Sequence, residues 1–338
     1  MDFDFIRPKD TRFLIPFFLI ALLFLFSCDQ KDKQQVFSDN KAKWIQIEND
    51  LPDKDSLFYQ DDPSPLFRKK LFVDKKIKEA KLYVTSAGYN VVFINDKRVG
   101  KNILDPAWTD YSKRIYYTEY DVIDLLTQEQ NVVSVMLGNG FYNPLPLKMW
   151  GWLNLRKETS VGKPKFILKL IISYTDGNKE EIVSDSSWKY SFGPIVRNSV
   201  YLGSHYDARN EIKGWQLSNF DDSSWKNVQI SQSPGGVIEK AFFPGVEIIK
   251  EIEPVNIYEI DKNKWIVDMG ENFTGTYKIK LSGKSGEKVS FRLGERVYDD
   301  GSLNPMTAVT GQIKREGVGG SGAPEIAWQA GSYIFGDE

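Results

Sequence analysis

The sequence predicts an all-β fold made of two β-sandwich domains. From Phe67 onward, short apolar or alternating runs are separated by turn residues. Hardly any segment keeps the 3.6-residue periodicity of an amphipathic helix. The strand-like runs form two blocks on either side of Ser233-Pro234-Gly235-Gly236, and 338 residues are enough for about two domains.

The first block, placed at residues 44–240, is rich in β-branched and aromatic residues, which fit a pleated, half-buried strand. The segment from Asp121 to Leu126 suggests a helical turn with Asp121 as its N-cap. Two similar turns, Ser184–Trp188 and Asp221–Trp225, favour a buried corner closed by the Trp, with sugar stacking as the alternative. The expected strands are Lys81–Thr85, Tyr89–Ile94, Asn131–Leu137, Phe166–Tyr174 and Glu181–Val183.

The second block, residues 241–338, resumes the strand pattern with Gly-rich turns between the runs. No returning segment follows its final apolar run, and an unpaired apolar strand at a sheet edge favours aggregation. We therefore expect the second sandwich to be incomplete. The expected strands are Trp265–Asp268, Thr276–Leu281, Lys288–Leu293, Ile326–Trp328 and Ser332–Phe335.

The N-terminus has the pattern of a bacterial lipoprotein signal. Basic residues precede an apolar run from Phe13 to Phe26, which is short for a bilayer span. Leu25-Phe26-Ser27-Cys28 then resembles a lipobox, in which Cys28 becomes the acylated first residue; an uncleaved anchor is the alternative. We expect a signal peptide at residues 1–27, a tether at 28–43 and an exported lipoprotein facing the periplasm or cell surface.

The composition excludes several classes of function. Lys and Arg number 44, Asp and Glu number 46, and the net charge of −2 gives no basic footprint for nucleic acid. A single Cys and a single His exclude disulfides and clustered Cys/His metal sites. We expect no cofactor; calcium would suit loop oxygens, but no stretch has dense oxygen-ligand spacing. Acid–base chemistry would therefore use carboxylates.

Ordered motifs resemble the N-terminal β-sandwich domains of bacterial α-L-rhamnosidases, glycoside hydrolase family 78. The resemblance covers nearly everything from about Phe67 onward and implies galactose-binding-like, jelly-roll sandwiches. Glu271 replaces the Gln that the family usually has. The similar stretches are Leu82–Tyr89, Leu104–Tyr111, Leu137–Tyr142, Val200–Gly203, Tyr206–Arg209, Gly214-Trp215, Asp268–Gly275, Gly294–Arg296 and Asp300–Asn304.

The resemblance implies an inverting glycosidase that removes terminal α-L-rhamnose with paired carboxylates in an (α/α)6 barrel. Inversion needs a general acid and a general base about 6.5–9.5 Å apart. In the family these acids lie in an Asp-Cys-Pro-x-Arg-Asp-Glu-Arg-type stretch and in a later barrel Glu. The only Cys here is Cys28, and twelve helices would need far more helical sequence than is present. We expect the catalytic barrel to be absent and assign no catalytic residue.

Two groups of carboxylates lie near turns: Asp105 with Asp110, and Glu295 with Asp299 and Asp300. Two carboxylates of either group could in principle flank a glycosidic bond. Asp-Pro and Asp-Asp-Gly are ordinary turn sequences, however, and turn chemistry explains both groups better.

His205 lies two residues from Asp207, which invites comparison with a catalytic triad. Triads assemble in space, and no Gly-x-Ser-x-Gly motif accompanies this pair. We expect a structural histidine.

The candidate carbohydrate-binding residues are Trp108, Tyr142, Trp150 and Trp152, because flat rings in irregular segments can stack on the apolar face of a pyranose. Residues 143–150 have no strand pattern, which would leave the rings free to project. The alternative is a loop packed against the barrel domain. The sequence leaves both open.

Three functions remain. The first is a non-catalytic part of an exported α-L-rhamnosidase that acts on plant or bacterial glycans and is inactive alone. The second is a stand-alone lipoprotein that binds rhamnose-containing glycans. The third is a structural subunit that pairs with a catalytic (α/α)6 domain in another or longer chain.

Overall fold

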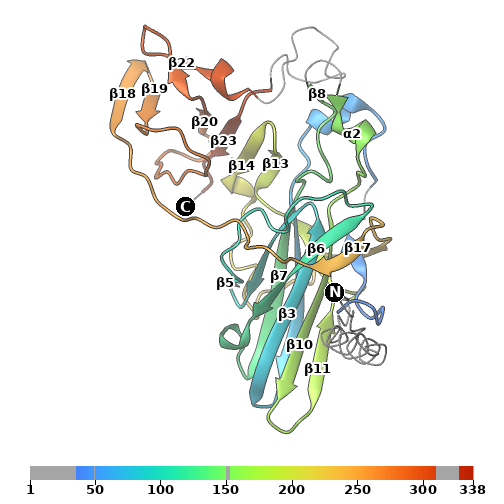
Figure 1. The fold of residues 1–338 in the computed structure, drawn as a ribbon. Helices are drawn as coiled ribbons and strands as arrows, with labels where there is room; N and C mark the ends of the chain where they lie inside the picture. The colour runs from blue at the N-terminus through green and yellow to red at the C-terminus, as the bar shows by residue number, and fades with distance from the viewer. Residues whose placement is uncertain (1–35, 49, 150–152, 310–326, 338) are drawn as a thin grey trace, which may run out of the picture.

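The fold is built almost entirely from β-strands (Figure 1). The computed structural model describes residues 36–48, 50–149, 153–309 and 327–337. Within these ranges the one α-helix is α2 (Leu155–Glu158), a single turn, beside four short 3-10 turns. No helix in the described part of the chain is long and apolar enough to cross a bilayer. The predicted all-β class is confirmed.

The first region, residues 36–240, contains a seven-stranded sheet with the order β16–β1–β10–β3–β6–β17 and with β11 paired to β10. Neighbouring strands are antiparallel, except that β17 runs parallel to β6. The strands are β1 (Trp44–Gln46), β3 (Ile77–Ala87), β6 (Arg114–Asp121), β10 (Lys165–Tyr174), β11 (Lys179–Val183), β16 (Gln229–Ser231) and β17 (Val237–Lys240).

An antiparallel six-stranded sheet with the order β15–β12–β2–β7–β4–β5 faces the first. A two-stranded hairpin, β8 (Lys148–Met149) with β9 (Leu153–Asn154), lies outside both sheets. The six strands are β2 (Pro65–Val73), β4 (Tyr89–Ile94), β5 (Lys97–Arg98), β7 (Glu129–Gly138), β12 (Lys189–Phe192) and β15 (Lys226–Asn227).

One apolar core fills the space between the two sheets. Alternate residues along β3 point into it, among them Leu82 and Val84, because successive side chains of a strand face opposite sides. Phe166 meets Phe67 and Trp188 edge-on, with ring centroids 5.1 and 5.3 Å apart. Full burial of one such side chain stabilises the fold by about 1.5–3 kcal/mol. This core therefore dominates the stability of the first region.

The strands expected in the first block are confirmed, since they coincide with or lie within β3, β4, β7, β10 and β11. The corner turns are confirmed too: the Asp185 carboxylate accepts a hydrogen bond from the backbone two residues on (2.9 Å), and Trp188 and Trp225 are buried. The predicted helical turn is the 3-10 turn η2 (Ile123–Leu125). Its N-cap is Val122 and not the expected Asp121, although the N–H of Ile123 donates to the Asp121 carboxylate (3.2 Å).

A third, mixed sheet joins the first region to the second. Its order is β13–β14–β23–β20, with β14 parallel to β23 and the other pairs antiparallel. We call the parallel pairing of β14 with β23 the seam. Gly203 lies at the seam with φ of +75°, and a Cβ there would meet the Ala330 carbonyl oxygen at 1.5 Å. The sheet crosses the predicted boundary at residue 240; the boundary itself stays a prediction. The strands are β13 (Ile195–Ser199), β14 (Gly203–Asp207), β20 (Lys288–Arg292) and β23 (Ala330–Ile334).

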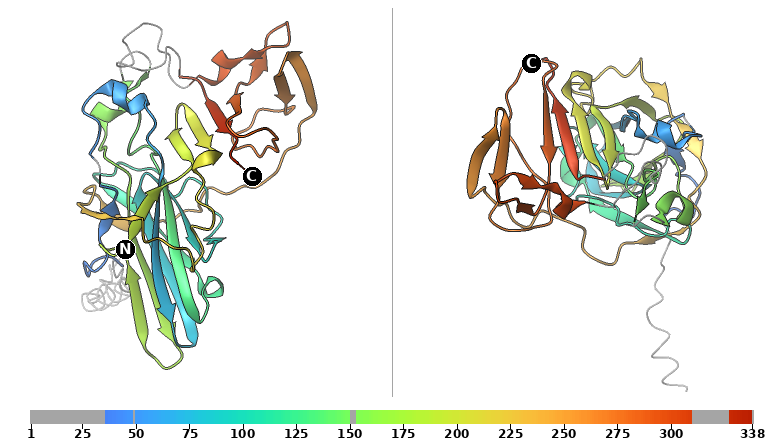
Figure 2. Two further views of the ribbon diagram at one scale, coloured as in Figure 1. Left: turned by 180° about the vertical axis from the view of Figure 1, so that it is seen from behind. Right: turned by 90° about the horizontal axis from the view of Figure 1, so that it is seen from above.

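The second region, residues 241–337, lies beside one end of the sandwich and is reached through an extended segment, residues 241–255 (Figures 1 and 2). It adds two hairpins, β18 (Asn256–Asp261) with β19 (Lys264–Asp268), and β21 (Arg296–Val297) with β22 (Leu303–Asn304). The expected strands at residues 265–268, 288–293 and 332–335 are confirmed within one or two residues at each end. The one expected at Thr276–Leu281 is wrong: this segment is not a strand, none of the described strands pairs with it, and Tyr277 and Ile279 are exposed.

Candidate carbohydrate-binding site

Trp108 lies on an ordered loop between β5 and β6. The loop is fixed on one side of Trp108 by a hydrogen bond from the N–H of Asn90 to the Asp105 carbonyl (2.7 Å). On the other side, the Asp110 carboxylate accepts a hydrogen bond from the N–H of Ser112 (3.1 Å). The indole remains 48% exposed. The loop thus holds a large flat ring at the surface.

Phe141 supports that ring from one face. The two rings are stacked with centroids 4.5 Å apart and planes 27° from parallel. Phe141 in turn meets Tyr201 edge-on at 6.2 Å. An aromatic ring that is already immobilised loses little entropy when it binds a ligand. Trp108 is therefore suited to stack against a sugar ring.

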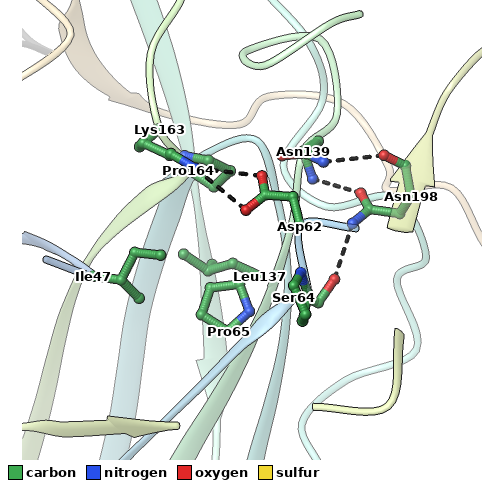
Figure 3. Close-up of a pocket in the computed structure, with 10 residues that line it drawn as sticks. Ile47, Asp62, Ser64, Pro65, Leu137, Asn139, Lys163, Pro164 and Asn198 are labelled. Carbon is green, nitrogen blue, oxygen red and sulfur yellow. Dashed lines mark hydrogen bonds and ion pairs between the residues drawn. The ribbon is translucent and has the colours of Figure 1, made fainter. Parts of the chain in front are cut away.

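A polar network fixes the turn that precedes Phe141 (Figure 3). The N–H and side-chain amide of Asn139 donate to the side chain and carbonyl of Asn198 (2.7 and 3.0 Å), and the Asn198 amide donates to Ser64 (2.9 Å). The nearly buried Lys163 pairs with Asp62 at 3.3 Å. These residues surround a cavity of about 10 Å³, which holds no more than one water. The network holds the turn that positions Phe141, but its own cavity is too small to bind a sugar.

Sequence reasoning missed Asn139 and Asn198. The only signal for the first was its position between two glycines, in Gly138-Asn139-Gly140, where Asn commonly forms a turn. Asn198 lies 59 residues further along the chain. Nothing local indicated that the two would meet.

Tyr142 faces the interior. It is 4% exposed and meets the buried Tyr111 edge-on at 5.1 Å. Burial raises the pKa of its hydroxyl. Its ring offers no open face to a sugar in this structure, because the turn that follows β7 places Tyr142 in the interior against Tyr111.

The loop after Tyr142 packs on the chain's own residues. Leu145 and Leu147 are buried in a cluster with Tyr201 and Ala327. The Arg156 guanidinium donates to a loop carbonyl at 2.6 Å. Up to residue 147 the loop is therefore held by its own domain and by Ala327 of the second region. Two of the other predicted site residues, Trp150 and Trp152, and the predicted lipidation site, Cys28, lie outside the described residues.

Asp105 and Asp110 have separate structural roles. The Asp105 carboxylate is buried and accepts hydrogen bonds from Asn102, Thr118 and Tyr120 at 3.1–3.3 Å. Burial raises its pKa, although these hydrogen bonds act in the opposite direction. Asp110 is on the surface, where hydrogen bonds from Ser112 and from Lys113 lower its pKa. Turn chemistry, as expected, explains Asp110, whereas Asp105 is held mainly by side chains of β6.

The second carboxylate group also shows turn chemistry. Asp300 accepts hydrogen bonds from the N–H and hydroxyl of Ser302 (2.9 and 2.6 Å), which lower its pKa. The backbone N–H of Glu295 donates to Thr307 (2.8 Å). Across the described ranges, no three His, Cys, Asp or Glu side chains gather as they would around a metal ion.

His205 lies on β14, where its Nδ1 is 2.8 Å from the Ser332 hydroxyl on β23. Burial, aided by the charges of Arg197 and Lys288, lowers its pKa to about 4. Asp207 points its carboxylate at Arg209, with its Oδ1 2.8 Å from the guanidinium Nε, so it does not orient the imidazole. The arrangement is that of a neutral histidine in a strand contact.

Two family models match the sequence. The model described as the α-L-rhamnosidase N-terminal domain covers residues 75–250, and the one described as the bacterial α-L-rhamnosidase concanavalin-like domain covers residues 258–331. Among curated proteins, an α-L-rhamnosidase of Formosa agariphila is 32% identical over 277 residues, which is 77% of this chain and 29% of the relative.

Two solved structures have the same fold over most of this chain. The α-L-rhamnosidase from Dictyoglumus thermophilum has a TM-score of 0.73 and 35% identity, covering 89% of this chain and 32% of that one. The Streptomyces avermitilis α-L-rhamnosidase complexed with L-rhamnose has a TM-score of 0.72 and 26% identity, covering 82% and 25%. The chain spans less than a third of the length of these relatives.

Proposed function

The chain belongs to the α-L-rhamnosidase family, and from this premise we propose that it acts as the non-catalytic, amino-terminal part of an exported enzyme for terminal α-L-rhamnose. The observation that carries the proposal is structural. The described residues contain one single-turn helix and no helical barrel. Asp110 and Asp300 are held by turn hydrogen bonds, and Asp105 is held by Thr118 of β6. In this proposal the chain supports the enzyme or binds carbohydrate.

An assay with an aryl α-L-rhamnoside tests this directly. The purified chain should release no aryl alcohol above the buffer rate. A trace of an active α-L-rhamnosidase, added to the same reaction, shows that the chain does not inhibit the assay. Turnover that follows the chain through a further chromatographic step would contradict the proposal.

Trp108 favours a second function, glycan binding. Its ring is exposed and already held by Phe141. Rhamnose-bearing oligosaccharides should bind saturably, and Trp108→Ala should weaken binding about threefold to tenfold, the contribution of one stacked ring. The matched control is Trp265→Ala, which removes another exposed Trp from β19. An equal effect of both substitutions, or no saturable binding, would remove this function.

Membrane anchoring through Cys28 completes the proposal. Fatty acylation at this position, after cleavage of residues 1–27, would place the protein on the periplasmic or outer face of a membrane. Cys28→Ala should move the protein from the membrane fraction to the soluble fraction and abolish labelling by a radioactive fatty acid. A labelled Cys28→Ala protein would exclude acylation at this site.

Exposed apolar side chains in the second region favour pairing with a catalytic domain. Ile257, Trp265 and Val267 on the β18–β19 hairpin are each about half exposed. An isolated (α/α)6 barrel of a relative should form a one-to-one complex with the chain, and Val267→Lys should weaken that complex. Phe72→Lys, which changes an exposed apolar residue of the first region, should have no effect. A complex insensitive to Val267→Lys would place the contact elsewhere.

A further inference from the structure

A cavity of about 170 Å³ lies where the chain leaves the first region. Strand β17 pairs with β6 only as far as Tyr117. The chain then crosses to the loop before β6, where the N–H of Ile103 donates to the carbonyl of Val246 (2.7 Å). The cavity lies between these two attachments and is lined by three segments, within residues 102–107, 116–119 and 240–246.

The walls of this cavity are held in place without a ligand. The Asp105 carboxylate is fixed by Asn102 and Thr118 at 3.1–3.3 Å. Phe243, on the crossing segment, meets the buried Tyr116 edge-on at 5.1 Å. Preformed pockets with a few convergent polar groups are typical of small-molecule sites, because little ordering is needed when the ligand binds.

The lining combines apolar and hydrogen-bonding groups. Leu104 and Phe243 supply apolar surface, while Glu119 and Lys240 form an ion pair at 2.5 Å. The carboxylates of Asp105 and Glu119 outnumber the ammonium group of Lys240. The lining therefore has a small excess of negative charge, which disfavours the binding of an anion. This lining suits a ring that has an apolar face and a rim of hydroxyls. The apolar side chains would contact the face, and the hydrogen-bonding groups would contact the hydroxyls.

We propose that this cavity binds one pyranose ring of a neutral sugar, with Glu119 accepting a hydrogen bond from a hydroxyl and Lys240 donating one. An apolar cavity of about 150 Å³ holds a benzene ring, so this space accommodates one six-membered ring and no second one. The choice of a sugar rests on the proposed carbohydrate-related function. Trp108 does not line the cavity, so the two sites are independent.

Saturation-transfer NMR and calorimetry with methyl α-L-rhamnopyranoside and methyl β-D-galactopyranoside test the proposal on the full chain. A dissociation constant on the order of 1–10 mM is expected for a ligand of about a dozen non-hydrogen atoms. Glu119→Gln should weaken binding about tenfold, because it removes a charge-assisted hydrogen bond. Phe243→Ala should weaken it about threefold to tenfold through lost apolar contact.

Each cavity variant has a matched control outside the lining. Glu239 pairs with Arg114 at 3.2 Å on the same two strands but does not line the cavity, so Glu239→Gln should leave the affinity unchanged. Phe242 is 82% exposed and also outside the lining, so Phe242→Ala should do the same. Circular dichroism and the melting temperature confirm that each variant is folded.

Three results would overturn the proposal: no saturable binding of either glycoside, equal losses in a cavity variant and its control, or binding of n-butylammonium in place of both glycosides. Trp108→Ala separates the two sites. Monosaccharide binding that survives Trp108→Ala and fails in Glu119→Gln supports the cavity. Loss in Trp108→Ala alone assigns the sugar to the Trp108 surface and leaves the proposed function standing.

Discussion

The two regions of the molecule have similar strand patterns but different interiors. Between residues 36 and 240, two facing sheets bury a continuous core that includes Trp188, Phe166 and Leu82. Between residues 241 and 337, the buried apolar side chains among the described residues are Ile266, Ala327 and Phe335. Many others there remain open to solvent, including Ile257, Trp265 and Val267. An apolar strand pattern therefore does not by itself predict burial, which requires a second sheet facing the strand.

The difference shows where the stability of each region originates. The first region folds around its own core. Among the described strands, the second region is tied to the first by the parallel pair of β23 with β14. The folded structure of the second region should depend on that seam far more than on its own apolar residues. Three substitutions test this difference between the two regions.

The largest effect is expected from Trp188→Ala, which empties the centre of the first core. Trp188 is fully buried, and its indole N–H donates to the Val183 carbonyl (2.9 Å). The free energy of unfolding should fall by about 3–5 kcal/mol. Trp265→Ala, at a residue that is 59% exposed, should change it by less than about 0.5 kcal/mol. Urea denaturation of both variants measures the contrast, and equal losses would show that the two regions share one core.

Gly203→Ala should have the next largest effect, and it should act on the seam. A methyl group there would collide with the Ala330 carbonyl, and the positive φ adds strain, for a total of about 2–3 kcal/mol. Gly177→Ala has a similar φ but open space around it, and should cost about 1 kcal/mol. Hydrogen exchange should show faster exchange in β23 and β20 for Gly203→Ala alone. Unchanged protection of β23 would mean that the seam does not organise the second region.

The smallest effect concerns pH. Because burial lowers the pKa of His205 from its ordinary 6.5 to about 4, the unfolded chain binds the proton more readily than the folded chain. Stability should therefore fall as pH decreases from about 6.5 to about 4. Because solvent screens this half-buried group, the melting temperature should fall by only about 2–4 °C. His205→Asn should flatten the curve in this window. Since His205 is the only histidine, an unchanged slope would assign the titration to carboxylates.

Much of the first region could be predicted because its strands are long and obey local rules. Leu82 and Val84 alternate with polar or outward-facing residues, and the Asp185 turn closes on a Trp, as the composition of each segment indicates. The candidate site was only partly predictable. Trp108 is exposed as expected, whereas Tyr142 turned out to be buried against Tyr111. Adjacent aromatic residues on one loop point in opposite directions, and the sequence does not say which one faces out.

The second region was harder to predict because its contacts are distant in sequence. The pairing of β14 with β23 joins segments more than a hundred residues apart, and no local sequence pattern predicts it. The cavity beside Glu119 has the same origin, since Lys240 and Phe243 come from a segment far from β6. The apolar alternation of Thr276–Leu281 predicted a strand that lacks a partner. Local propensity could not supply the missing neighbour.

The parallel seam also has a consequence for the order of synthesis. Residues 203–207 leave the ribosome well before residues 330–334, and translation at about 5–20 residues per second leaves that edge of β14 unpaired for roughly 6–25 s. An exposed strand edge is open to wrong partners throughout such an interval. The hydrogen bond between His205 and Ser332, which joins β14 to β23, is therefore among the last native contacts to form. A chaperone that shields β14 until residues 330–334 have been made would act on this edge.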